Sequence, residues 1–202
     1  SRRLGDAGFL DYVGKFGFGQ KTGIPLTGEV AGRVLPRKSW DMLTWSRMAM
    51  GHSIAVTPLQ MAMAVSAIAN GGTLMKPQIV QEIRDDSGTV LDSLAPEPVR
   101  RVCSERAAAA LRTAMEGVVG EKGTGSKAAI PGVRVAGKTG TAQLYTANGK
   151  SIDEGHYCVS FAGFAPADKP ELCAMGVVDD PHAPQSELFG GVLAGPSCAQ
   201  LM

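Results

Sequence analysis

Three segments late in the sequence have the residue pattern of β-strands, and they constrain the fold most. They cover residues 133–144, 156–164 and 172–179, and each is rich in Val, Ala, Phe and other strand-compatible residues. Two loops with hairpin character, 145–155 and 165–171, connect them, and the first contains Asn148-Gly149. Asn-Gly is a common turn pair in hairpins. The pattern predicts three strands joined by hairpin loops.

Helix signals precede the strands. Thr57-Pro58 offers an N-cap and a proline at the first helical position, and Asn70-Gly71-Gly72 is a stop signal, so we expect a helix over 58–69. This helix is apolar nearly all round, which predicts a path through the core. A first helix is expected after Asp6, which would cap it, and should end at Gly17. Another is expected from the cap Ser104 to about Val119, with Ala107–Leu111 and Met115 as its packing face. A last helix is expected to begin at residue 191.

The remaining segments are predicted to be less regular. Residues 17–47 are rich in Gly and Pro, which predicts a long ordered loop. Two extended pieces, about 73–84 and 89–91, flank the turn signal Asp85-Asp86-Ser87-Gly88.

Composition and charge exclude several classes of protein. With 202 residues, 44% hydrophobic and 19% charged, the chain is long enough for one domain or two small ones and is not disordered. The net charge is +1, with +3 before residue 102 and −2 after it, so we expect no basic arm, no acidic tail and no nucleic-acid partner. The apolar stretch Leu59–Ala69 is too short to span a membrane.

The cysteines and histidines do not form a metal-binding pattern. Cys103, Cys158, Cys173 and Cys198 contain no C-x-x-C pair, and the three histidines are far apart, so we expect neither a metal site nor a cofactor. Buried free thiols are expected. If 156–164 pairs with 172–179, the residue numbers of opposite residues sum to about 336. Cys158 then lies near Val178 and Cys173 near Gly163, so no disulfide is expected between the two strands.

The segment Val135–Gln143 is the strongest local signal, and two mechanisms compete for it. Gly132–Thr139 satisfies G-x-x-x-x-G-K-[ST], the phosphate-binding loop, which requires a helix that begins at Lys138. Lys138-Thr139-Gly140 is alternatively the K-T-G motif of serine acyltransferases that react with β-lactams, which requires a strand there. The alternating Val-Arg-Val and the later Gly140 and Asn148-Gly149 favour the strand. Lys21-Thr22-Gly23, a second copy in a loop, is interpreted as incidental.

Other segments in order around this motif resemble one known family. They are Phe16–Ile24, Gly51–Ala62, Ala67–Pro77, Gly123–Ala128, Ala136–Gln143, Ser160–Ala167 and Gly190–Pro196. Together they resemble the transpeptidase domain of class B penicillin-binding proteins over essentially all 202 residues, and Val177–Pro181 is most similar to the cell-division branch. The resemblance implies an α+β fold, in which an antiparallel sheet is flanked by helices.

The resemblance also implies roles for residues that match the motif. Lys138 would be the cation of the site and would help to hold the substrate anion. Thr139 and Thr141 would bind the carboxylate of a D-Ala-D-Ala stem peptide or a β-lactam, Gly140 would allow close approach of the substrate, and the Thr141 N–H would be one oxyanion donor. The implied partners are peptidoglycan, β-lactams and other cell-wall synthesis or division proteins, on the periplasmic side of the bacterial inner membrane through an N-terminal anchor.

Two further motifs of the family do not occur in this sequence. No Ser has Lys three residues later or Asn two residues later, so S-x-x-K, with the nucleophile, and S-x-N are absent. We therefore expect 1–202 to be the C-terminal part of a single transpeptidase domain, unable to be acylated alone, with the edge of 172–179 open. A penicillin-sensing or pseudo-enzyme domain would retain the same strand, and it stays an alternative.

Four other features are expected to be structural. His52 is interpreted as a loop-packing residue, Asp179-Asp180 as a turn at a strand end, and Trp40 and Trp45 as covers of the core.

Overall fold

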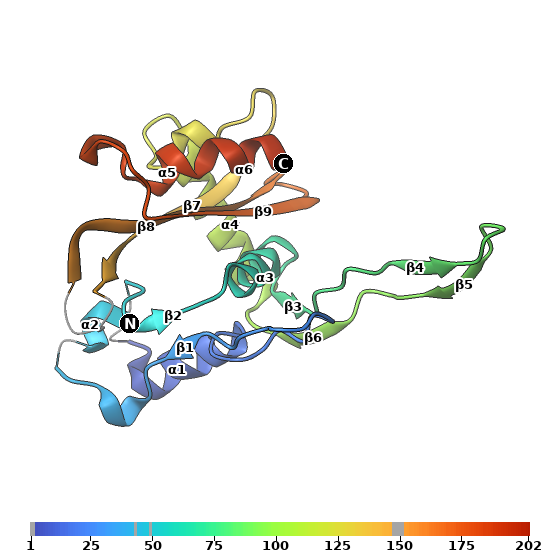
Figure 1. The fold of residues 1–202 in the computed structure, drawn as a ribbon, viewed down its shortest axis with the longest axis horizontal. Helices are drawn as coiled ribbons and strands as arrows, with labels where there is room; N and C mark the ends of the chain where they lie inside the picture. Colours follow the sequence, from blue (N-terminus) through green and yellow to red (C-terminus); the bar gives the residue numbers. More distant parts are fainter. Residues whose placement is uncertain (1–2, 43, 49, 147–151) are drawn as a thin grey trace. The chain divides into compact units, whose positions relative to one another are not determined.

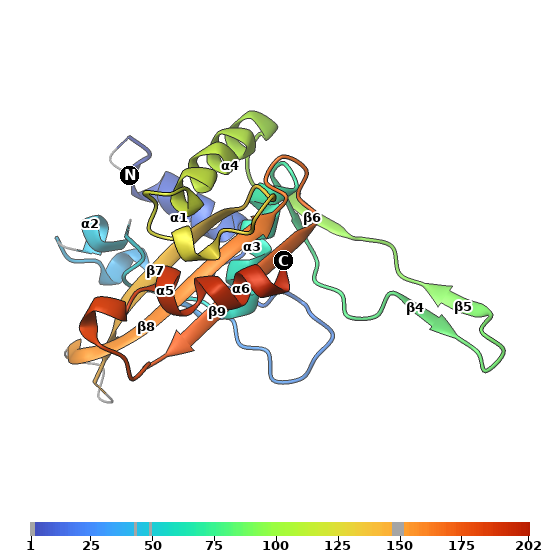
Figure 2. The ribbon, with the colours of Figure 1, turned by 90° about the horizontal axis from the view of Figure 1, so that it is seen from above.

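The computed structural model describes residues 3–42, 44–48, 50–146 and 152–202, which form two compact units. The first unit comprises residues 1–67 and 73–102, and the second comprises residues 68–72 and 103–202. Figure 1 and Figure 2 show the elements of each unit in two perpendicular views. The predicted turn Asn148-Gly149 and the side chain of Trp45 lie outside the described part.

The first unit combines helices with small antiparallel strand pairs. The pairs are β1 (Arg33–Val34) with β2 (Ile54–Ala55), β3 (Thr73–Met75) with β6 (Pro98–Arg101), and β4 (Glu82–Arg84) with β5 (Val90–Ser93). The helices are α1 (Gly5–Lys15), η1 (Arg37–Ser39), α2 (Thr44–Met48) and most of α3 (Pro58–Ala69). The predicted loop 17–47 therefore contains only short regular pieces.

Helix α1 begins differently from the sequence prediction. Leu4 occupies the N-cap position, and no side chain caps the helix, so the prediction that Asp6 is the cap was wrong. Asp6 lies in the first turn and pairs with Arg37 at 2.5 Å, where a carboxylate is favourable near the positive end of the helix dipole. The helix ends at Lys15, two residues before Gly17, whose φ of +87° continues the chain away from it.

Helix α3 has the predicted bounds and the predicted caps. The Thr57 hydroxyl accepts a hydrogen bond from the Gln60 amide at 3.1 Å, and the Gln60 side-chain oxygen accepts one from the Thr57 amide at 2.9 Å, which is a capping box. Gly71, with φ +87°, follows the helix end. Every residue from 59 to 69 is buried or half-buried, so the helix runs through the core as expected.

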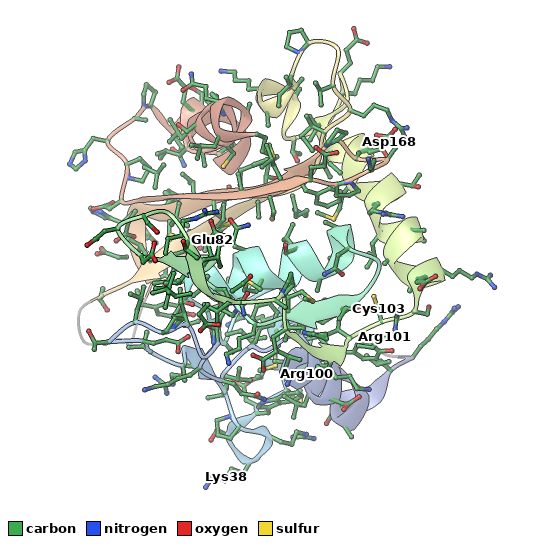
Figure 3. The ribbon with its side chains drawn as sticks, turned by 90° about the vertical axis from the view of Figure 1, so that its right-hand side faces the viewer. Lys38, Glu82, Arg100, Arg101, Cys103 and Asp168 are labelled. Carbon is green, nitrogen blue, oxygen red and sulfur yellow. The ribbon has the colours of Figure 1, made fainter. Side chains whose placement is uncertain are left out.

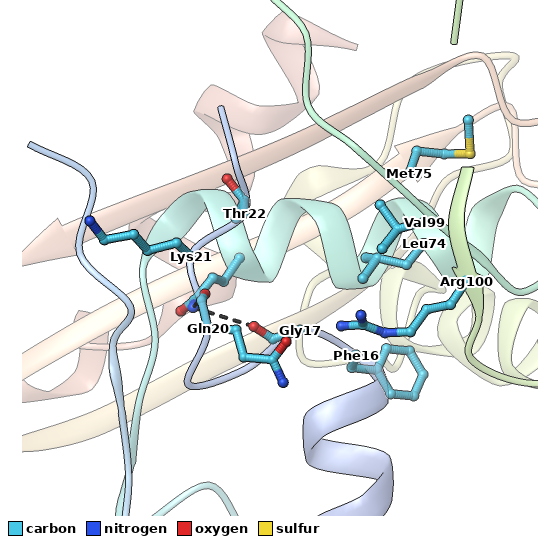
Figure 4. A pocket seen from close by; sticks show the side chains of 10 residues that line it. Phe16, Gly17, Gln20, Lys21, Thr22, Leu74, Met75, Val99 and Arg100 are labelled. Carbon is cyan, nitrogen blue, oxygen red and sulfur yellow. Dashed lines mark hydrogen bonds between the residues drawn. The ribbon is translucent and has the colours of Figure 1, made fainter. Parts of the chain in front are cut away.

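Gln60 also closes the loop 17–31 around the start of α3. Its side chain is 1% exposed, and its amide nitrogen donates to the carbonyls of Gln20 at 2.6 Å, Ala31 at 2.9 Å and Gly17 at 3.4 Å. A small cavity of about 70 Å³ lies beside it. Figure 4 shows the side chains that line this cavity, with the hydrogen bond to the Gly17 carbonyl as a dashed line. One buried amide thus holds three separate points of an irregular segment.

The pair β4–β5 forms a long exposed hairpin in the first unit. The predicted turn closes the hairpin, because the Asp85 carboxylate accepts hydrogen bonds from the Ser87 hydroxyl at 2.6 Å and from the amides of Thr89 and Ser87 at 2.8 and 2.9 Å. The hydroxyl bond first, and then the amide bonds, lower the pKa of this carboxyl. The first extended piece, predicted as 73–84, is two strands, β3 and β4, with an irregular link between them. Strand β6 was not predicted.

The second unit contains a three-stranded antiparallel sheet in the order β7-β8-β9. Its strands are β7 (Ala136–Tyr145), β8 (Ile152–Ala165) and β9 (Leu172–Asp179), and its helices are α4 (Glu105–Val119), η2 (Ser126–Ala128), η3 (Gln185–Glu187), α5 (Gly190–Leu193) and α6 (Gly195–Leu201). Helices α5 and α6 lie along one face of the sheet (Figure 1). The outer edge of β9 pairs with no strand among the described residues, as the sequence predicted.

The pairing of β8 with β9 differs from the predicted register by one residue. Cys158 lies opposite Asp179 and Cys173 opposite Phe164, so partner numbers sum to 337. No disulfide joins the cysteines within the described part of the chain, but only Cys198 is buried, so the expectation of buried thiols was wrong for the other three. Burial raises the pKa of the Cys158 and Cys198 thiols.

Helix α4 has the predicted N-cap, but fewer of its residues are buried than the sequence predicted. The Ser104 hydroxyl accepts from the Ala107 amide at 3.2 Å, and Gly120 follows the last turn. The buried residues are Ala108, Met115 and Val119, one stripe of the helix, whereas Leu111 is 41% exposed. Val119 joins Phe161, Ala165, Ala174 and Cys198 in the core of the second unit.

Candidate active site

Strand β7 carries the four predicted site residues in sequence. Lys138, Thr139, Gly140 and Thr141 lie opposite Ala162, Phe161, Ser160 and Val159 of β8. Among the described residues the other edge of β7 pairs with no strand. The four residues therefore line one open sheet edge.

Two of the four residues, Lys138 and Thr141, are exposed. The Lys138 ammonium donates to the Thr139 carbonyl oxygen at 2.7 Å and is otherwise in contact with solvent. Thr141 is exposed, and its hydroxyl has no hydrogen bond within the described part of the chain. The strand therefore exposes both a cation and a hydroxyl, two groups that can bind an anion.

Thr139 is held by a residue to which the sequence interpretation gave no role. Its hydroxyl lies 3.0 Å from the hydroxyl of Thr124, and Thr139 is half-buried. Thr124 belongs to Gly123–Ala128, which was used only for the family resemblance. The Gly-Thr-Gly of that segment was the available signal, but the sequence alone does not show that this loop reaches β7.

Gly140 lies close to a side chain of the neighbouring strand. A Cβ at this position would lie 2.4 Å from the Ser160 hydroxyl oxygen on the neighbouring strand. The space beside Gly140 is therefore occupied by a side chain of β8. Close approach of a substrate to Gly140 stays a prediction.

Two glycines of helix α5 bring its backbone against the site strand. A Cβ on Gly190 would lie 1.9 Å from the Ser160 carbonyl oxygen and 2.6 Å from that of Gly140. A Cβ on Gly191 would lie 2.0 Å from the carbonyl oxygen of Thr124. Helix α5 thus fixes both the motif strand and the loop that holds Thr139.

We expect Gly190→Ala to destabilise the second unit by about 3 kcal/mol, because the new methyl group overlaps backbone atoms that cannot rotate away. Urea unfolding of the full-length protein measures the change. Gly117→Ala in α4 is the matched control, since a Cβ there meets no atom within 4 Å, and it should be neutral or stabilise by up to about 1 kcal/mol. Equal effects of the two variants would contradict the close packing of α5.

A histidine–carboxylate pair links β8 to the residue that follows the end of β9. His156 Nδ1 lies 2.7 Å from an oxygen of Asp180, and the Asp180 amide donates to the Tyr157 carbonyl at 2.9 Å. The hydrogen bond and charge of Asp180, with a smaller contribution from Asp153, raise the pKa of His156 above its usual 6.5. The predicted turn at Asp179-Asp180 is confirmed, and Asp180 adopts a φ of +46°.

This pair should make stability depend on pH. Because the folded pKa of His156 is raised, its stabilising effect is complete below the ordinary value and is lost as pH rises through the folded pKa. We expect the midpoint of the His156 ring signals in NMR to lie above 6.5 and to return toward it in Asp180→Asn, which tolerates the positive φ. Asp153→Asn should lower the midpoint less. An unchanged midpoint in Asp180→Asn would contradict the pairing.

Other residues considered in the sequence have structural positions. The second K-T-G copy forms a loop closed by Glu29, which accepts from the Thr22 amide at 2.6 Å and hydroxyl at 2.5 Å; these bonds lower the pKa of Glu29. Trp40 is half-buried and donates to the Leu35 carbonyl at 2.9 Å, and His52 is half-buried in the first unit. No cluster of three or more potential metal ligands occurs within the described ranges.

The conformation at Lys138 decides between the two mechanisms proposed for the motif. Residues 136–145 form a continuous strand, whereas a phosphate-binding loop requires a helix that begins at Lys138. The phosphate-binding alternative is therefore excluded.

Comparison with known proteins agrees with this geometry. The family model described as the penicillin binding protein transpeptidase domain matches residues 1–202. The chain belongs to this family. The resemblance found in the sequence and the α+β fold that it implied are confirmed.

Individual relatives match nearly the whole chain. Stage V sporulation protein D of Bacillus subtilis is 42% identical over 201 residues, which are 99% of this chain and 30% of that protein. Peptidoglycan D,D-transpeptidase FtsI of Escherichia coli is 31% identical over 193 residues, 96% of this chain and 30% of that protein. The structure resembles penicillin binding protein 3 of Mycobacterium tuberculosis, with a TM-score of 0.87 and 32% identity over 99% of this chain and 46% of that one.

The chain spans about a third of the length of these curated relatives. Among the helices that the structure describes, none combines the length and apolar character needed to cross a membrane.

Proposed function

We propose that the protein containing this chain is a penicillin-binding D,D-transpeptidase that crosslinks peptidoglycan stem peptides on the periplasmic side of the inner membrane. The observation that carries the proposal is the open edge of β7, where Lys138, Thr139 and Thr141 follow one another on a strand supported from behind by α5. Relatives named D,D-transpeptidases and a related structure complexed with ampicillin support the assignment.

The proposed roles follow from the chemistry of the exposed groups. The Lys138 ammonium and the hydroxyls of Thr139 and Thr141 bind the terminal carboxylate of a D-Ala-D-Ala peptide or a β-lactam. The Thr141 amide donates to the oxyanion as a Ser outside this sequence attacks the carbonyl. The Ser forms an ester as D-alanine leaves with a proton, and the amine of a second stem peptide then displaces the Ser to form the crosslink. No metal or cofactor takes part in the proposed reaction.

A matched pair of ligands tests the carboxylate role. The full-length protein is treated with a penicillin or with its methyl ester, and the covalent adduct is followed by intact-mass spectrometry. The free acid should react roughly 10- to 100-fold faster than the ester, as expected for a charge-assisted hydrogen bond network. Thr141→Val should reduce this preference, and Thr113→Val in α4, which is exposed and hydrogen-bonds within its own helix, should leave it unchanged.

The remaining outcomes separate the proposal from the sensor alternative. A full-length protein that forms no adduct with either ligand would overturn the proposal. An adduct without turnover of a D-Ala-D-Ala peptide in the presence of an amine acceptor would indicate a penicillin-sensing domain. Residues 1–202 alone should give no adduct, because they lack S-x-x-K.

A further inference from the structure

The hairpin of the first unit is exposed over its whole length, and residues 78–96 are called the acidic arm below. Every residue of the arm is exposed. Large apolar side chains are among them: Ile79 is 56% exposed, Ile83 49% and Leu91 66%. A two-stranded ribbon gains little stability from burial of its own side chains, so apolar groups on it are available to another surface.

A hollow of about 330 Å³ lies between the two segments of the arm, residues 78–81 and 94–96, next to β4 and β5. Its apolar lining comes from Ile79, Val80, Leu94 and Pro96, and two glutamines, Gln78 and Gln81, complete it. This volume is large enough for one or two apolar side chains.

The charge of the arm indicates which kind of partner could bind to it. It carries four carboxylates and one guanidinium, a net charge of −3 in a chain whose total is +1. The net charges of the two halves of the sequence do not reveal this local concentration of negative charge. Arg84 is paired with Glu82 at 2.6 Å, and Asp86 and Asp92 have no ion pair among the described residues. Anionic lipid and the arm of a second copy would both be repelled, whereas a basic segment would be attracted.

The pairing pattern shows which backbone groups are free. The Leu94 amide donates to the Gln81 carbonyl at 2.9 Å. Because hydrogen-bonded and non-hydrogen-bonded pairs alternate along antiparallel strands, the amide and carbonyl of Glu82 point away from β5. The outer edge of β5 is less open, since the Ser93 amide donates to the Asp92 carboxylate at 2.8 Å. Figure 3 shows Glu82 on the arm.

We propose that the outer edge of β4 is a docking site for an extended segment of another protein in which apolar and basic residues alternate. The segment adds a strand beside Glu82, one apolar side chain enters the hollow, and its cations are attracted by the net charge of −3 of the acidic arm. Strand addition gives affinity through main-chain hydrogen bonds, and the hollow and the carboxylates give selectivity.

A synthetic peptide tests the site in the full-length protein. An acetylated octapeptide of alternating lysine and valine, carrying a fluorophore, is titrated with protein and followed by fluorescence anisotropy. A matched peptide with glutamate in place of lysine is the charge control. The basic peptide should bind at least tenfold more tightly, and its binding should weaken as salt is raised.

Variants at one position isolate the strand-addition step. Glu82→Pro removes the outward amide, and Glu82→Ala retains it, while both remove the same carboxylate. Proline at an edge position that donates no ladder bond is compatible with the hairpin. Glu82→Pro should weaken binding at least tenfold relative to Glu82→Ala, and Leu94→Ser, at the hollow, should weaken it about tenfold relative to the unaltered protein.

Four results would overturn the proposal. They are absence of binding, equal binding of the acidic peptide, equal affinities of Glu82→Pro and Glu82→Ala, and binding of the basic peptide at a different surface in an NMR or hydrogen-exchange map. Concentration-dependent dimers that disappear in Glu82→Pro would instead assign the edge to a second copy of the chain.

Discussion

Lys138→Ala is expected to slow acylation of the full-length protein by penicillin roughly a thousandfold. Loss of one preorganised charge or donor at such a site typically costs a factor of 100 to 1,000, and Lys138 is the only cation in the K-T-G segment. Stability should change little, because the side chain is exposed and, within the described residues, hydrogen-bonds to the carbonyl of the next residue alone. The rate of adduct formation by intact-mass spectrometry is the measurement.

Two matched variants make this result specific. Lys169→Ala removes a lysine that is 87% exposed in the loop between β8 and β9, and it should leave the rate unchanged. Lys138→Arg keeps the charge but replaces a compact ammonium by a planar fork, so its rate should lie between the other two. If Lys138→Ala reacts at the normal rate with an unchanged melting temperature, Lys138 has no role in acylation.

Gln60→Leu is expected to destabilise the first unit by about 4 kcal/mol. The leucine fills similar space but leaves the carbonyls of Gln20 and Ala31 and the amide of Thr57 without their present partner, and each unsatisfied buried group costs about 1–3 kcal/mol. Gly32 strengthens the expectation, because a Cβ there would lie 2.9 Å from the Gln60 side-chain oxygen, so little room exists for a different packing.

Urea unfolding gives the stability change, and hydrogen exchange shows where it acts. Residues 17–31 should lose protection before the rest of the first unit. Gln78→Leu is the control, because its side chain is exposed and makes one hydrogen bond, to the Ala95 carbonyl at 3.0 Å; it should change stability by less than about 0.5 kcal/mol. Equal effects of the two substitutions would show that the buried amide is not the reason for the loss.

The sequence predicts those elements whose signals are local. Helix α3 has a cap, a proline and a glycine stop within its own residues, and its bounds were correct. Strand β9 was also correct, while β7 began three residues later than predicted and β8 was longer at both ends. The one-residue error in the β8–β9 register arose because the turn geometry, not the strand sequences, determines where pairing begins.

The parts that were missed depend on contacts between distant residues. Gln60 appears in the sequence as one polar residue in an apolar helix, and nothing local indicates that carbonyls 29 to 43 residues away meet it. Thr124 is 15 residues from the threonine that it contacts, across an irregular connection. The K-T-G residues could be recognised because the four residues 138–141 are consecutive in the sequence and also lie together on one strand. Their roles remain predictions.

The contact between α5 and the K-T-G strand has a consequence for the order in which the chain is completed during synthesis. A ribosome adds Lys138 some fifty residues before it adds Gly190, yet the backbone of Gly190 lies directly against Gly140 and Ser160. Domains generally fold as units, so β7 and β8 can pair early, but their back surface stays uncovered until the last part of this sequence has emerged. A prematurely terminated product would therefore present the K-T-G strand without the support behind it, and quality-control proteases would meet that exposed surface.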